Sequence, residues 1–133
     1  MTRLLASSLL VVLGLFVSTG CVKPPIEGRQ DPYAAPQIAF ASKDLRNKTA
    51  VDTPSVSRDE AGGILHITVP IRAATNLQLY VDYRTTFFDR NGQQISQTGW
   101  TRKTLAPNVP DRIVVNSMGP SAADFQLDLR YAK

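Results

Sequence analysis

The clearest pattern in the chain is an alternation of apolar and polar side chains over its second half. From Leu77 to Phe87 the odd positions are mostly apolar and the even positions mostly polar, and residues 65–73 and 125–131 repeat this pattern. Successive side chains of a β-strand point to opposite faces, so each run predicts a strand with one core face and one solvent face. Weaker strands are expected near residues 37–42, 51–58, 93–105 and 112–118.

Turn signals separate these runs. Residues 89–92 read Asp-Arg-Asn-Gly, which is typical of a β-hairpin because Asn-Gly tolerates positive φ. Pro70 lies inside a strand-like run and predicts an edge strand or a bulge there. Residues 120–123 are expected to form one helical turn, and no long amphipathic helix is visible. Many short strands with frequent turns predict an all-β sandwich.

The first twenty residues have a different pattern, typical of a secretory signal peptide. Arg3 precedes an apolar run from Leu4 to Val17, and residues 18–20 are small. The run is shorter than the roughly 20 residues that a membrane-spanning helix needs. Gly20-Cys21 resembles the lipobox of bacterial lipoproteins, although Ser18 stands where an aliphatic residue is usual. The alternative is a plain cleavage site with a chance cysteine beside it.

The lipobox resemblance implies cleavage between Gly20 and Cys21 and acylation of the Cys21 sulfur. Several acyl chains on one residue would hold the protein at a membrane, because each buried CH₂ contributes about 0.8 kcal/mol. Val22 stands where an Asp would resemble an inner-membrane retention signal, which favours the outer membrane. We therefore expect a signal peptide at 1–20, a lipidated, proline-rich tether at 21–36 and one β-sandwich domain at 37–133.

Charge and composition limit the kinds of partner. The net charge of the chain is +4, and it falls to +3 when Arg3 leaves with the signal peptide. Basic residues are dispersed, and Arg102-Lys103 is the only adjacent pair, so the clustered patch of a nucleic-acid-binding protein is missing. His66 is the single histidine and falls on a polar strand face, and no serine lies in a G-x-S-x-G motif. We expect no catalytic residues, no metal and no cofactor.

Two segments resemble the YcfL family of small bacterial periplasmic lipoproteins. They are "YVDYRTTFFDRNGQQI" at 80–95 and "RKTLAPNVPDRIVVNSMGPSAADFQLDLRYA" at 102–132. The resemblance covers residues 60–132 together with the lipobox. It implies an immunoglobulin-like β-sandwich on the periplasmic side of the outer membrane, a suspected link to envelope maintenance and no catalytic residues. The residues that carry it are Tyr83, Arg84, Phe87, Phe88, Asp89 and Gly92.

A candidate binding face follows from the same alternation. Tyr80, Arg84 and Phe88 fall on the outward face of one expected strand, and Trp100 joins them if it lies on the neighbouring strand. Exposed aromatic clusters mark interfaces or sugar platforms. The alternative is that these rings belong to the core of the second sheet or to a surface covered by the tether. We expect a non-enzymatic binding or scaffolding module whose partner is an envelope protein or peptidoglycan. The alternatives are an accessory subunit of a cell-wall enzyme and a carrier of a lipid or another ligand.

Overall fold

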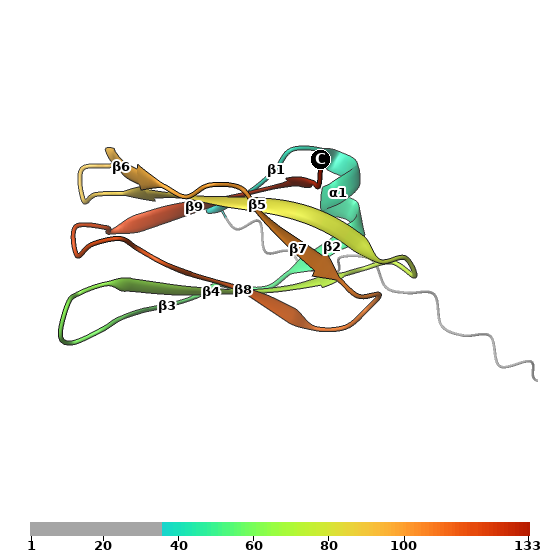
Figure 1. The fold of residues 1–133 in the computed structure, drawn as a ribbon, viewed down its shortest axis with the longest axis horizontal. Coiled ribbons are helices and arrows are strands. Elements are labelled where there is room, and N and C mark those ends of the chain that lie inside the picture. The colour runs from blue at the N-terminus through green and yellow to red at the C-terminus, as the bar shows by residue number, and fades with distance from the viewer. Residues whose placement is uncertain (1–35) are drawn as a thin grey trace, which may run out of the picture.

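The computed structural model describes residues 36–133, which fold into two β-sheets packed face to face (Figure 1). Each strong alternation in the sequence becomes a long strand, which confirms the prediction of an all-β sandwich. The strands of the first sheet are β1 (Ile38–Phe40), β5 (Leu79–Phe88), β6 (Gln94–Gln97), β7 (Thr101–Leu105) and β9 (Asp124–Tyr131). Those of the second are β2 (Thr49–Val51), β3 (Ser55–Arg58), β4 (Leu65–Ala73) and β8 (Asp111–Asn116).

In the five-stranded sheet, β5 and β9 form the centre and pair along most of their length. β1 lies outside β9 and runs parallel to it, whereas the other pairings of this sheet are antiparallel. β6 and β7 follow one another along the other side of β5, so the chain makes a break between them at residues 98–100. The candidate binding face lies beside this break.

In the four-stranded sheet, β4 is central, with β8 on one side and β2 followed by β3 on the other. The expectation that Pro70 marks an edge strand or a bulge is wrong, because β4 is paired on both sides and its register with β8 is unbroken. β2 ends opposite Ile71 and β3 begins opposite Thr68, so Pro70 faces the gap between them. Its carbonyl accepts the Asp52 N–H on that side at 3.1 Å. Its missing N–H points the same way, and no ladder bond is lost there.

The core lies between the sheets and consists of the alternating apolar positions. The inward side chains of β4 are all buried, as are most of those from β5 and β9, and they form one contiguous cluster. Full burial of a Leu, Val or Phe side chain contributes about 1.5–3 kcal/mol, so this cluster is the main source of stability. The largest fully buried members include Ile67, Val69, Phe87, Leu127 and Leu129.

One short helix, α1 (Lys43–Lys48), joins the two sheets and was not predicted. Ser42 caps it, because its hydroxyl accepts the Leu45 N–H at 3.2 Å. Leu45 is its one buried residue and belongs to the core cluster. Within residues 36–133, no helix is long and apolar enough to cross a membrane.

The loops agree with the turn signals in one place and differ in another. At residues 89–92 the expected hairpin turn is present: Gly92 has φ of 77°, and the Asp89 carboxylate accepts the N–H groups of Asn91 and Gln93. Residues 120–123 form a turn instead of the expected helical turn. There the Ala123 N–H donates to the Phe88 carbonyl at 2.7 Å, which draws the chain towards the end of β5.

Candidate binding face around Trp100

The outer face of the five-stranded sheet is built from two adjacent rows of polar side chains. Because β5 and β9 pair in antiparallel register, Asp82 lies opposite Arg130 and Arg84 lies opposite Asp128. Directly opposed opposite charges stabilise a sheet pair by a few tenths of a kcal/mol to about 1 kcal/mol. Acidic and basic side chains therefore alternate along and across these two strands.

Trp100 lies beside these charged side chains because the chain leaves the sheet between β6 and β7. Thr98 still holds the edge of β5: its N–H donates to the Thr85 carbonyl at 2.8 Å, and its hydroxyl accepts the Thr85 N–H at 2.9 Å. Thr101 then pairs with Tyr83, so Trp100 stands beside Arg84. Trp100 is 36% exposed.

Two guanidinium groups pack against the indole. The guanidinium carbons of Arg84 and Arg130 lie 4.5 and 3.7 Å from the ring centroid, which is cation–π geometry. Both arginines are also fixed by carboxylates: Arg84 pairs with Asp128 at 3.0 Å and Arg130 with Asp82 at 3.5 Å. The ring is thus held in one orientation by side chains that are themselves restrained.

Asp82 is the electrostatic centre of this arrangement. Its side chain is only 8% exposed and also contacts Arg102 at 3.3 Å and the Lys133 N–H at 3.4 Å. Burial acts to raise the pKa of Asp82, but the Lys133 N–H and the Arg102 and Arg130 guanidiniums more than offset it, so the pKa lies below its ordinary value. The carboxylate stays ionised and anchors both arginines.

The structure places the four predicted face residues as follows. Arg84 and Trp100 are in contact. Tyr80 is exposed on the same face, where its hydroxyl accepts the Gln78 amide at 3.2 Å. Phe88 is half-buried at the far end of β5, beside a shift in register. Eight residues of strand separate Tyr80 from Phe88, about 26 Å, so these two rings do not meet each other.

Arg130, Asp82 and Asp128 were not named as members of the binding face. Alternation showed that Asp82, Asp128 and Arg130 point outward from their own strands, but no sequence pattern indicates the β5–β9 register that brings them together. Gly20 and Cys21, the predicted cleavage and lipidation residues, lie outside the described residues, as do the signal peptide and nearly all of the tether. No group of three metal-ligating side chains occurs within residues 36–133.

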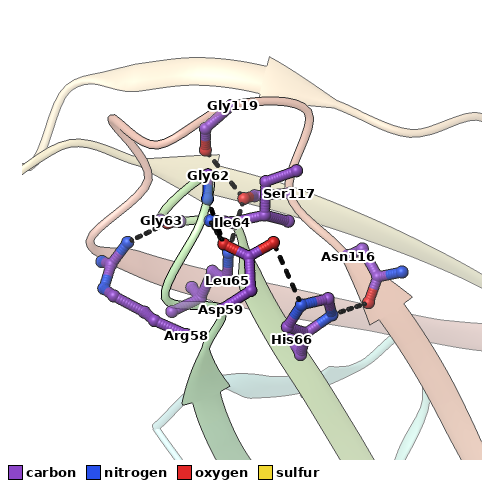
Figure 2. A network of polar contacts seen from close by, with 10 residues as sticks. All are labelled: Arg58, Asp59, Gly62, Gly63, Ile64, Leu65, His66, Asn116, Ser117 and Gly119. Carbon is purple, nitrogen blue, oxygen red and sulfur yellow. Dashed lines mark hydrogen bonds and ion pairs between the residues drawn. The ribbon is translucent and has the colours of Figure 1, made fainter.

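His66 belongs to a second polar network, at one end of the four-stranded sheet (Figure 2). Its ring lies between Asn116, with Nδ1 2.8 Å from Oδ1, and Asp59, with Nε2 3.8 Å from Oδ2. The Asp59 carboxylate accepts the N–H groups of Gly62 and Ile64, which lowers its pKa. These contacts join the β3–β4 turn to the end of β8.

The nearby Ser117 hydroxyl is buried and already bonded in the same network. It accepts the Leu65 N–H at 2.9 Å and donates to the Gly119 carbonyl at 2.8 Å. Arg58 donates to the carbonyls of Gly63 and Ala122 and so ties the same turn to the loop after β8. The polar groups of this network bind one another and the backbone, which makes it a brace between two loops.

Comparison with known proteins gives a family and a fold. No curated protein matches the chain significantly. A crystal structure of Campylobacter jejuni cj0090 superposes with a TM-score of 0.62 at 14% identity, over 72% of this chain and 98% of that one. A crystal structure of a DUF1425 family member from a Shewanella species superposes with a TM-score of 0.57 at 18% identity, over 64% of this chain and 79% of that one. The family model described as a protein of unknown function, DUF1425, matches residues 37–131, and the chain therefore belongs to the DUF1425 family.

Proposed function

We propose that this chain is a YcfL-like lipoprotein of the outer membrane whose periplasmic sandwich is a non-enzymatic binding or scaffolding module. The anchor rests on the sequence: a signal-peptide pattern ends in Gly20-Cys21, and Cys21 is the only cysteine in the chain. The binding role rests on one observation, the indole of Trp100 held against two guanidiniums on the outer face of the five-stranded sheet.

Immobilisation of Trp100 is what makes this face suited to binding. Trp and Arg are enriched at the energetically dominant positions of interfaces. A side chain that is already ordered loses little conformational entropy when a partner binds, and that loss is otherwise about 0.5–1.5 kcal/mol per side chain. An envelope protein or peptidoglycan offers flat apolar faces for the indole and polar groups for Arg84 and Arg102.

The polar network around His66 supports a non-enzymatic role rather than a hydrolytic one. A catalytic serine needs a free hydroxyl close to the histidine. The Ser117 hydroxyl instead makes two hydrogen bonds within its own loops, and the His66 ring is bonded to Asn116. A wall-hydrolysing activity that is lost in a His66→Ala variant would contradict the non-enzymatic role.

The binding role is tested by affinity capture of the partner from solubilised envelopes. Trp100→Ala combined with Tyr80→Ala removes the exposed rings of the face, and we expect capture to be lost while the domain keeps a cooperative melting transition. Val114→Ala with Met118→Ala removes two exposed apolar side chains elsewhere and is the matched control. Undiminished capture by the Trp100/Tyr80 variant would refute the assignment of this face.

The anchor is tested separately. Intact-mass analysis and labelling with radioactive palmitate should show a chain that begins at acylated Cys21, and Cys21→Ala should release the domain from the membrane fraction. A mature chain with an unmodified Cys21 thiol would contradict the anchor without affecting the binding face.

A further inference from the structure

The two ends of the sandwich carry opposite charge. At one end lie α1, the β4–β5 turn and the β7–β8 loop; at the other lie the β3–β4 and β5–β6 turns and the start of β9 (Figure 1). The first end carries six basic residues against three acidic ones, a net of +3: Lys43, Arg46, Lys48, Arg72, Lys103 and Arg112 against Asp44, Asp52 and Asp111. The second carries two against four, a net of −2: Arg58 and Arg90 against Asp59, Glu60, Asp89 and Asp124.

The excess charge at the basic end is available to a partner. Lys48 pairs with Asp44 at 2.9 Å, and Lys103 pairs with Asp111 at 3.0 Å. The other four cations of this end, Lys43, Arg46, Arg72 and Arg112, form no ion pair within residues 36–133. A net charge of +3 at one end of so small a domain generates a field that attracts an anionic surface.

Two exposed aliphatic side chains project from the same end. Leu77, in the β4–β5 turn, is 71% exposed, and Val109, in the β7–β8 loop, is 52% exposed. Asn108, which has φ of 56°, joins these two loops: its N–H donates to the Ala73 carbonyl at 3.0 Å, and its side chain contacts Thr75 and Arg72. The two apolar tips are therefore carried on connected loops.

We propose that this basic end docks on an anionic lipid surface, with Leu77 and Val109 entering the headgroup region. An anionic leaflet contributes about 1 kcal/mol per nearby Lys or Arg, and aliphatic side chains add burial in the interface. Two separate tips lack the contiguous buried area of about 1,000 Å² or more that a stable protein interface requires. A lipid surface has no such requirement.

The proposal rests on the proposed membrane anchor, and the tether is long enough to allow it. The described chain starts beside β1, whose Ile38 pairs with Leu127, roughly 20–25 Å from the basic end along β9. Residues 21–36 reach about 50 Å when fully extended. In the docked orientation the long axis of the sandwich is perpendicular to the bilayer and the acidic end points away from it. The Trp100 face remains exposed at the side of the domain.

The test uses the full chain reconstituted in vesicles of phosphatidylglycerol and phosphatidylethanolamine. A bimane probe on Leu77→Cys reports membrane depth through quenching by doxyl-labelled lipids, and a probe on Glu60→Cys at the acidic end is the control. We expect quenching at position 77 and none at 60, and a loss of quenching in neutral phosphatidylcholine vesicles. Equal quenching at both positions, or quenching at 77 that is the same in neutral vesicles, would overturn the proposal.

Charge variants test the electrostatic part. Arg46→Gln with Arg112→Gln should lower the docking equilibrium constant about 30-fold, because each of the two cations contributes about 1 kcal/mol. Arg90→Gln, at the acidic end, should leave it unchanged. Mass spectrometry of the unlabelled parent chain separates the two proposals: an unacylated Cys21 refutes the lipid anchor alone, and acylated Cys21 without quenching at position 77 refutes docking alone.

Discussion

The guanidinium carbon of Arg130 lies 3.7 Å from the centroid of the Trp100 ring, although 29 residues of sequence separate them. The Nε of Arg130 is buried and has no hydrogen-bond partner within the described residues. The main polar contact of Arg130 is with Asp82, so its guanidinium lies between the Asp82 carboxylate and the face of the Trp100 ring. This pair holds the indole in place on the proposed binding face.

A double-mutant cycle should detect this contact. We expect Trp100→Leu and Arg130→Gln to show a coupling free energy of about 0.5–1 kcal/mol in urea unfolding, the range for cation–π pairs near a surface. The cycle of Trp100→Leu with Arg90→Gln, which lies in a distant turn, should give no coupling. A coupling of zero for the Trp100–Arg130 pair would mean that the indole is not held by this arginine.

Asp82 should contribute to the loss of thermal stability at acidic pH. Because its pKa is lowered in the folded protein, it stabilises the fold above its unfolded pKa of about 3.9 and loses this contribution as the pH falls through the folded value. We expect Asp82→Asn to lower the melting temperature at neutral pH, and the difference from the parent to shrink below about pH 4. Circular dichroism melts measure this, and Asp124→Asn, which is exposed, is the control. A difference that is constant with pH would contradict the role of the ionised carboxylate.

The unpredicted helix should depend on one buried side chain. Leu45 is fully buried, and Leu45→Ala should lower the free energy of unfolding by about 2–5 kcal/mol. Ser42→Ala removes the N-cap and should cost about 1 kcal/mol. Arg46→Ala, exposed on the same helix, should change stability by less than about 0.5 kcal/mol. A Leu45→Ala effect as small as that of Arg46→Ala would show that α1 is not packed into the core.

The sandwich could be predicted because alternation is a local property. A residue two positions along a strand returns to the same face, so the inward residues of β4, β5 and β9 were visible in the sequence. The helix α1 could not be predicted in this way, because six residues with one buried leucine show no periodicity. The prediction for Pro70 was wrong for a related reason. A proline is accommodated in β4 because it faces a gap between β2 and β3, and the sequence of β4 does not reveal that gap.

The candidate face was predictable only in part. Alternation placed Arg84 outward, and Trp100 was expected beside it if its strand was the neighbour of β5. The partners of these residues depend on the β5–β9 register, which pairs residues more than 40 positions apart. Arg130 and Asp128 therefore appear beside these residues only when the fold is known, whereas alternation alone places Asp82 on the outward face of β5.

Site-specific photocrosslinking in intact cells tests the central claim, partner binding through the Trp100 face, most directly. A photoreactive amino acid at Thr104, exposed on the outer face of the five-stranded sheet opposite Tyr80, should give a discrete crosslinked envelope partner. The same amino acid at Val114, exposed on the outer face of the four-stranded sheet, should give none. Crosslinks to the same partner of equal strength from both positions, or from Val114 alone, would contradict the account.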